Sequence, residues 1–349
     1  MTRHSYIFTL FASVLCILSG CSREYCNCDS TAASNGPSDV MLMISSPYGS
    51  PNTKSAADYQ KIETIRIYAY RHGSSDTAPV GYAYYTDITT DGPYYCPVFL
   101  ETSGTIDFIV ILNDARIDSP ARTPEENMTR SELDGITFTG LKGTEDQIPV
   151  PMCNERSGDA DGSSNFSFTV SDTDEYKLIP IDVKRSVSQM RLNFAKNGES
   201  TITVTGAVLY NGPDSAPLTL QDSNINGTGL YAGKSVTLIQ SPVELQTGSL
   251  KEMAQTMLLP NPYGSSSPDT YSPYTSGYNN IDRVYRIDVS YEIQGTGGYM
   301  EYKQKSIYMP AVRANQSIDI NCVIGDKVES SLEIIATPWK DAGMDIEFN

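Results

Sequence analysis

The sequence has little histidine and tryptophan, and this scarcity restricts the chemistry that it can support. Two histidines occur in 349 residues, and only His72 lies beyond the N-terminus, in a predicted turn with the sequence YRHGSSD. One histidine provides neither a multi-histidine metal site nor a Ser-His-Asp triad. The sequence also contains no Gly-x-Ser-x-Gly nucleophile elbow and no glycine-rich phosphate loop. We therefore expect no catalytic residue, no metal site and no cofactor.

Positive charge is also scarce. Lys and Arg total 25 against 42 Asp and Glu, which gives a formal net charge of -17. This charge disfavours binding to nucleic acids and to anionic membrane surfaces. Paired carboxylates would be enough for a glycosidase, but the acidic residues cluster in predicted turns, where solvation accounts for them. We therefore predict that the protein is not an enzyme.

Long apolar runs are absent apart from one at the N-terminus. Residues 7–18 are almost continuously apolar, follow Arg3 and His4, and are too short to span a bilayer as a helix. This pattern is typical of a secretory signal peptide, which we assign to residues 1–20. The run ends in Leu-Ser-Gly-Cys at 18–21, which resembles the lipobox of bacterial lipoproteins. We expect cleavage between Gly20 and Cys21 and acylation of the Cys21 thiol, with an ordinary signal peptide as the alternative.

Four of the seven cysteines fall within the first thirty residues. Cys26 and Cys28 lie in a polar segment rich in Ser, Asn and Gly, which we interpret as a flexible tether. A single intervening residue is a poor span for a disulfide, and no further ligand follows at a spacing that suits zinc. The remaining three, Cys96, Cys153 and Cys322, lie far apart and are odd in number, so the sequence predicts no disulfide scaffold.

The rest of the composition favours an all-β fold. Tyr is abundant, at 23 residues. Segments such as YRIDVSYEI at 285–293 and TIDFIVILND at 105–114 alternate apolar and polar residues, and turns rich in Gly, Asn and Pro separate them. Short strands of this kind predict antiparallel β-sandwiches. The only helix that we expect runs from Thr123 to Leu133, because this segment opens with Thr-Pro-Glu-Glu.

The length allows two domains after the N-terminal segments. A loop-rich stretch ends near Ile179–Lys184, where a new set of alternating segments begins. We place an N-terminal sandwich at residues 55–180 and a C-terminal sandwich at residues 181–349. Residues 21–54 then form a lipidated tether and a first strand.

Several segments follow one another in an informative order. The apolar strand DVMLMIS at 39–45 precedes a polar loop, SPYGSPNTKSAADYQ, which carries Lys54, and the strand IETIRIYAY comes next. TIDFIVILND, QIPVPMCNE and VKRSVSQMRLNF follow, and the chain closes on SIDINCVIGDKVESSLEIIATPWKDAGMDIEFN. This order resembles the fimbrillins, the lipoprotein-derived subunits of type V pili.

The resemblance implies two tandem transthyretin-like antiparallel β-sandwiches and a maturation step. In that family a trypsin-like protease cuts after a basic residue in the loop that follows the first strand. Lys54 fits this role because Pro and Gly residues keep its loop extended and exposed. We therefore expect a cut between Lys54 and Ser55, with Lys61 as a rival site. The first strand would leave with its lipid, and a strand from another subunit would fill the groove.

The resemblance also implies that the C-terminal segment is the donor strand. Leu332, Ile334 and Ala336 alternate along it, and Trp339, the only tryptophan, follows them. Side chains of a strand repeat every two residues, so these could enter the pockets that the first strand vacates. The alternative is a terminal strand that packs within its own chain, with Trp339 as an anchor in the core.

We therefore predict a structural subunit of a type V pilus that supports adhesion. It would be made as an outer membrane lipoprotein precursor and would then join a fimbrium at the cell surface. The expected partners are other copies or related subunits, the maturation protease, and a host protein or glycan. Three alternatives stay open: a tip adhesin, an anchor subunit, and a non-polymerising lipoprotein that binds glycans through the Tyr-rich segment 261–280.

Overall fold

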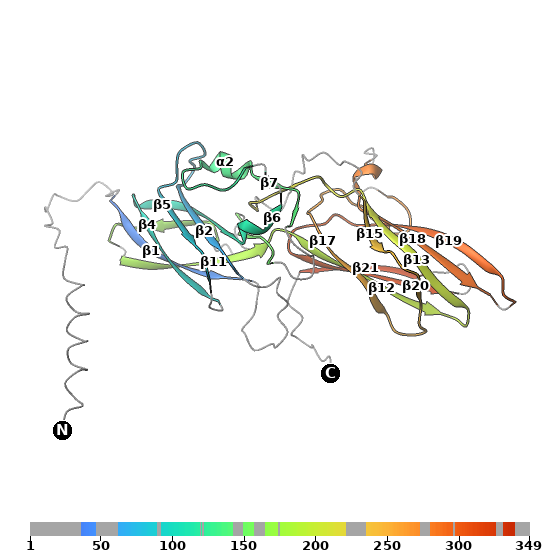
Figure 1. The fold of residues 1–349 in the computed structure, drawn as a ribbon. Coiled ribbons are helices and arrows are strands. Elements are labelled where there is room, and N and C mark those ends of the chain that lie inside the picture. The colour runs from blue at the N-terminus through green and yellow to red at the C-terminus, as the bar shows by residue number, and fades with distance from the viewer. Residues whose placement is uncertain are drawn as a thin grey trace, which may run out of the picture. The chain divides into compact units, whose positions relative to one another are not determined.

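The structure is a computed structural model, and it confirms the all-β prediction. It describes residues 36–46, 62–88, 92–118, 120, 122–141, 149–156, 165–173, 175–220, 235–272, 280–295, 297–325 and 331–338. These residues form strands β1 to β21 (Figure 1). The helical elements among them are the 3-10 turns η2 (Asp114–Arg116) and η3 (Ile281–Arg283) and one short helix, α2 (Arg130–Asp134).

The first domain is built on an eight-stranded sheet. Its strands follow the order β3-β2-β5-β9-β11-β1-β4, and β10 pairs with β5. In chain order they are β1 (Ser38–Ser45), β2 (Ile65–Arg71), β3 (Gly81–Tyr85), β4 (Tyr94–Leu100), β5 (Gly104–Leu112), β9 (Met152–Asn154), β10 (Ser167–Val170) and β11 (Glu175–Arg185). Two further short pairs are β6 (Ile117–Asp118) with β8 (Gly140–Leu141), and β7 (Thr137–Phe138) with β14 (Ala216–Pro217).

The second domain has two sheets. The four-stranded sheet has the order β17-β12-β20-β21, and the five-stranded sheet has the order β15-β13-β18-β19, with β16 paired to β13. Their bounds are β12 (Ser188–Asn197), β13 (Thr201–Tyr210), β15 (Ser235–Ile239), β16 (Val243–Glu244), β17 (Lys251–Leu258), β18 (Arg286–Gln294), β19 (Met300–Tyr308), β20 (Gln316–Gly325) and β21 (Ser331–Pro338). Each domain encloses its own cluster of buried apolar side chains.

The prediction of purely antiparallel pairing is wrong at two places. β1 pairs in parallel with β11, and β12 pairs in parallel with β20. Parallel neighbours need a long connection, and both pairs join strands that are distant in the sequence. Local alternation of apolar residues identifies a strand but does not fix its direction relative to a distant neighbour.

The chain passes from the eight-stranded sheet to the four-stranded sheet between β11 and β12. β11 crosses residue 180 and stays in the first sheet as far as Arg185, so the division that we placed at 180/181 falls inside this strand. Along this stretch, Val187 still packs in the first core, and Met190 is the first residue that packs in the second core. Residues 216–220 then return to the first core, where the Leu218 N–H donates to the Ile136 carbonyl at 2.9 Å.

Helix α2 begins later than the Thr-Pro-Glu-Glu segment that suggested a helix here. α2 is capped by Thr129, whose side chain accepts from the Glu132 N–H, while the Glu132 carboxylate accepts from the Thr129 N–H. This reciprocal cap fixes the start of the helix. Upstream, the Tyr68 hydroxyl donates to the Glu125 carbonyl at 2.8 Å. In a helix that began earlier, this carbonyl would instead accept a backbone N–H from within the helix.

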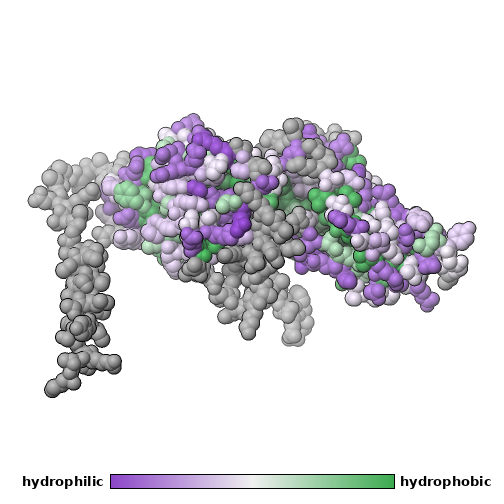
Figure 2. Space-filling view, viewed as in Figure 1, coloured by the Kyte–Doolittle hydropathy of each residue, from purple (hydrophilic) through white to green (hydrophobic). Residues whose placement is uncertain are grey.

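On the face that Figure 2 shows, hydrophilic residues are interspersed with intermediate and apolar ones. Inside the second domain, the chain after β17 packs tightly on the chain after β19. The Asn261 N–H donates to the Val312 carbonyl at 2.7 Å, and Gly264 lies against the backbone of Pro310 and Ala311. A Cβ at Gly264 would lie 2.0 Å from the Ala311 nitrogen, which no side chain can tolerate without backbone movement.

Gly264→Ala should therefore destabilise the protein by about 1–3 kcal/mol, because the added methyl group meets backbone atoms. Gly140→Ala is the matched control, since a Cβ there meets no heavy atom within 4 Å. Its effect should stay within about 0.5 kcal/mol. Urea unfolding followed by circular dichroism measures both, and equal midpoints for the two variants would contradict the packing described.

Candidate functional site, the first and last described strands

β1 lies inside the first sheet, with a hydrogen-bonded strand on each side. It pairs antiparallel with β4 from Ser38 opposite Leu100 to Ile44 opposite Tyr94. On its other edge it runs parallel to β11, as far as Ser45 opposite Asp182. Figure 1 shows the three strands side by side. We call the position between β4 and β11 the β1 slot.

The inward side chains of β1 form part of the first core. Val40, Leu42 and Ile44 are all 0% exposed. Burial of each such side chain contributes about 1.5–3 kcal/mol relative to exposure. Removal of β1 would therefore open an apolar trench and free the backbone donors and acceptors of two strand edges, and both effects are costly in water.

Cys96 lies next to β1 in this core. It is opposite Leu42 in the β4 register and is buried. Burial raises the pKa of the Cys96 thiol to about 11, so the neutral thiol predominates at neutral pH. The accessibility of this thiol consequently depends on β1 remaining in its slot.

The predicted processing residues lie outside the described residues. Gly20 and Cys21 precede residue 36, and Lys54, Ser55 and Lys61 fall between residues 46 and 62. The chain is described again from Ile62, which is buried beside the start of β2. The lipidation and cleavage assignments therefore stay predictions.

The predicted donor segment forms β21, at the edge of the four-stranded sheet. It pairs only with β20 among the described strands, from Val323 opposite Ser331 to Gln316 opposite Pro338. Leu332 and Ile334 are half-buried against the second core, whereas Ala336 is exposed. Trp339 lies outside the described residues. β21 is thus held on one edge and buries much less apolar surface than β1.

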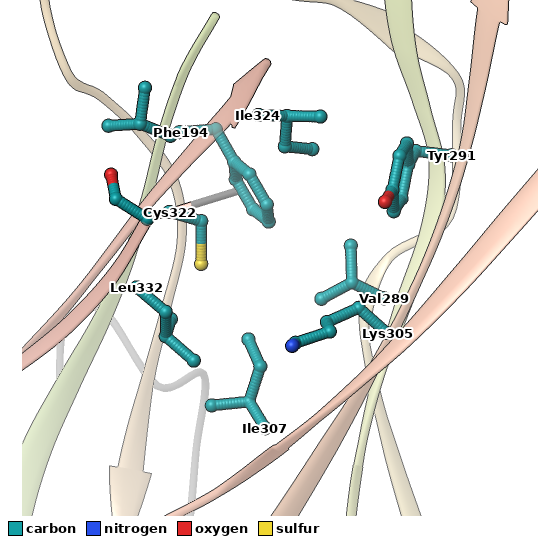
Figure 3. Close-up of a pocket in the computed structure, with 10 residues that line it drawn as sticks. Phe194, Val289, Tyr291, Lys305, Ile307, Cys322, Ile324 and Leu332 are labelled. Carbon is teal, nitrogen blue, oxygen red and sulfur yellow. The ribbon is translucent and has the colours of Figure 1, made fainter. Parts of the chain in front are cut away.

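A narrow cleft lies behind β21, between the two sheets of the second domain. Figure 3 shows Leu332 and Cys322 on one side and Val289 and Ile307 on the other, with the Lys305 side chain across the gap. Only about 20 Å³ of the cleft admits the centre of a water molecule, far less than a small-molecule site requires.

One polar cluster has the composition of a catalytic triad but not its geometry. Asp107 is fully buried in β5 and accepts from Ser167 Oγ at 2.5 Å and from the Arg130 guanidinium at 2.8 Å. His72 Nδ1 contacts the same carboxylate at 2.8 Å and lies 3.5 Å from Ser167 Oγ. A triad needs the second ring nitrogen of the histidine to take the serine proton, whereas here both side chains bind one carboxylate. The Asp107 carboxylate therefore links β5 to β10, to α2 and to the residue after β2.

The burial of Asp107 was not predicted. The alternation in TIDFIVILND assigns Asp107 to a polar face, but Arg130, which neutralises it, comes from a distant helix. Among the described residues, no group of three or more His, Cys, Asp or Glu side chains is placed to hold a metal ion. Within the same residues, no helix is both long enough and apolar enough to cross a membrane.

The Tyr-rich segment that suggested a glycan platform is partly engaged with its own domain. The Arg283 guanidinium donates to the Tyr263 hydroxyl at 2.9 Å and lies over its ring. The Tyr271 hydroxyl accepts from the Asn280 N–H at 3.0 Å, and its ring lies 5.9 Å from that of Tyr308. These two rings therefore have intramolecular partners.

No protein-family model matches the chain, and no match occurs among curated protein sequences. Solved structures do match its fold. A proposed cell adhesion protein of Parabacteroides distasonis superposes with a TM-score of 0.57 at 9% identity, over 90% of this chain and 100% of that one. The chain therefore shares its fold with this proposed cell adhesion protein.

Two further structures support this likeness. A proposed cell adhesion protein of Bacteroides eggerthii gives a TM-score of 0.53 at 10% identity and covers 88% of this chain and 98% of its own. A fimbrial protein of Bacteroides vulgatus gives 0.52 at 12% identity, with coverages of 86% and 99%. The resemblance inferred from the order of features is thus confirmed at the level of the fold, whereas the transthyretin-like assignment of each sandwich stays a prediction.

The contribution of β1 can be measured with two neighbouring substitutions. Leu42→Ala removes a fully buried side chain and should cost about 2–5 kcal/mol of unfolding free energy. Met41→Ala, on the half-exposed face of the same strand, should cost less than half as much. Chemical denaturation of the full chain measures both, and equal losses would show that β1 does not fill the core as described.

Proposed function

We propose that this chain is a structural subunit of a type V pilus. In this proposal it is exported as a lipoprotein, cut behind its first strand and polymerised by strand exchange, in support of adhesion. Its partners are other copies or related subunits and a protease that cuts after a basic residue. The observation that carries the proposal is β1, which is central to the first sheet and buried in its core.

The physical reason is that an emptied β1 slot cannot stay empty in water. A cut between Lys54 and Ser55 would sever β1 from the rest of the domain, since β1 ends at Ser45 and β2 begins at Ile65. After β1 has left, the free edges of β4 and β11 favour the addition of any extended segment with alternating apolar side chains. Refilling of the slot therefore provides the free energy for assembly.

β21 is the segment best suited to refill the slot. It has eight residues, as β1 has. It lies at a sheet edge, and Leu332, Ile334 and Ala336 could replace the three inward side chains of β1. Donation by one copy to the next joins two different surfaces, and such contacts extend into filaments instead of closing. A structural role is also favoured over glycan binding by the intramolecular partners of Tyr263 and Tyr271.

Cutting the loop should expose Cys96. An accessible thiol has a pKa near 8.5, about 2.5 units below that of the buried Cys96 thiol, so alkylation at pH 8 should accelerate by more than roughly 100-fold while the slot is empty and fall again when a donated strand refills it. Limited trypsin digestion of the purified precursor, followed by iodoacetamide and peptide mass spectrometry, measures this change.

Two controls accompany this experiment. Cys153 in β9, where burial raises the thiol pKa to about 11, should stay unreactive because the proposed exchange does not involve it. The Lys54→Ala variant should remain uncut, monomeric and unreactive at Cys96, and adding Lys61→Ala tests the rival site. Cleavage at Lys54 that leaves Cys96 protected and produces no polymer would refute strand exchange.

The lipid anchor has a separate test. Cys21→Ala removes the only thiol at the predicted lipobox, so palmitate labelling should be lost and the precursor should leave the membrane fraction. Cys26→Ala is the matched control and should label normally. Unchanged labelling of the Cys21→Ala variant would show that the lipobox assignment is wrong.

A further inference from the structure

The two walls of the β1 slot are held in different ways. β11 has a second ladder partner, because Val183 to Arg185 pair with β9. The Asn165 side chain also bonds the backbone N–H and the carbonyl of Asp182, at 2.7 Å each. β4 stands last in the strand order, and β1 is its only ladder partner among the described strands. Removal of β1 would therefore leave β11 in a ladder and β4 without one.

β4 nevertheless has a neighbour on its outer side. β3 stands at the opposite end of the same strand order, and the sheet curves so that β3 lies against β4. No ladder joins these two strands over the residues that the structure describes. Instead, the Glu101 N–H, just after β4, donates to the carbonyl of Val80, just before β3, at 2.7 Å. The two ends of the sheet are thus joined at this point.

Two residues of β3 extend this contact, which we call the β3–β4 seam. A Cβ at Gly81 would lie 2.7 Å from both the Phe99 carbonyl oxygen and the Leu100 side chain, so glycine is what allows the strands to approach this closely. At the other end of β3, the Tyr85 hydroxyl donates to the Pro97 carbonyl. The Tyr85 ring packs against the first core, which fixes the position of its hydroxyl.

The Pro97 carbonyl shows which edge of β4 the seam occupies. The N–H and C=O of one residue in an antiparallel strand point to the same side. The Pro97 carbonyl accepts from a residue of β3, so it points away from β1. The N–H that proline lacks is therefore missing from the outer edge, and the edge that faces β1 loses no donor. The seam leaves the slot side of β4 complete.

We propose that the β3–β4 seam holds β4 in place as a wall of the slot after β1 has left, with Gly81 and Tyr85 as positioning residues. This inference rests on the proposed function, because strand exchange is the event that empties the slot. A donated strand binds both walls, so its apparent affinity falls with the fraction of molecules in which β4 is in position. The seam keeps that fraction high. In the uncut chain the ladder with β1 already fixes β4, and the seam is not needed there.

Substitutions in the seam test this inference in the full-length chain. Tyr85→Phe removes the hydroxyl bond, and Tyr302→Phe, at an exposed position of the second domain, is its control. Gly81→Ala adds a methyl group that meets β4, and Gly140→Ala, which meets nothing within 4 Å, is its control. Each precursor is cut with trypsin, separated from its β1 fragment and titrated with a synthetic peptide of residues 331–349. Binding should weaken roughly fivefold in Tyr85→Phe and roughly tenfold or more in Gly81→Ala, and neither control should change it.

Amide hydrogen exchange distinguishes a positioning role from a general loss of stability. In the uncut precursors, the β4 amides should be equally protected in Tyr85→Phe and in the unmodified chain, because β1 holds the strand. After the cut and before peptide is added, the Glu101 amide should stay protected in the unmodified chain, since its partner is Val80 and not a residue of β1. In Gly81→Ala it should exchange roughly tenfold faster. Loss of β4 protection in uncut Tyr85→Phe would show a role in folding alone and would overturn the inference.

The outcomes separate this inference from the proposed function. If the unmodified cut protein binds the peptide and both seam variants bind it equally well, the inference is wrong and strand exchange stands. If the unmodified cut protein does not bind the peptide, strand exchange is wrong, and the Glu101 amide still tests the seam. Rapid exchange of this amide after the cut would overturn the inference, whereas protection that is lost only in Gly81→Ala would support it.

Discussion

The pairing of β1 with both β4 and β11 is the interaction on which the first domain depends. A strand at a sheet edge can leave at the cost of one row of hydrogen bonds, whereas β1 satisfies two rows and fills the core with Val40, Leu42 and Ile44. Loss of β1 is therefore tolerable only if another strand takes its place. The same strand that stabilises the monomer would, once removed, make association with a second copy favourable.

β1 and β21 differ in the way that an exchange requires. β1 is central and buried on its inward face, whereas β21 is paired on one edge and is half-buried at Leu332 and Ile334. A strand that is weakly held in its own domain loses little when it leaves. In the proposed exchange it would gain a second row of hydrogen bonds and a deeper core on entering the β1 slot.

Much of the fold could be predicted because alternating apolar residues within one short segment identify both a strand and the side of it that faces the core. The alternation in YRIDVSYEI predicts β18, and Ile287, Val289 and Ile293 are buried there. Long-range partners are not encoded in this way. The burial of Asp107 depends on Arg130, and the parallel pairing of β1 depends on β11, which lies far along the chain.

The candidate site was predictable in part for the same reason. The sequence DVMLMIS predicts a first strand, but it does not indicate that Met41 and Met43 lie on the outward side of the sheet. This placement depends on β4 and β11, which put Pro97 and Leu178 on either side of Met41. The processing residues Cys21 and Lys54 were inferred from motif and loop composition, which require no tertiary partner.

The central claim is that the β1 slot accepts the terminal segment of another copy. Amide hydrogen exchange of the cut protein, with and without a synthetic peptide of residues 331–349, measures this most directly. The account predicts that β4 and β11 exchange quickly after the cut and regain protection when the peptide is added, and that a peptide with Leu332 and Ile334 replaced by Asp gives no protection. Equal exchange in β4 and β11 with and without the peptide would contradict it.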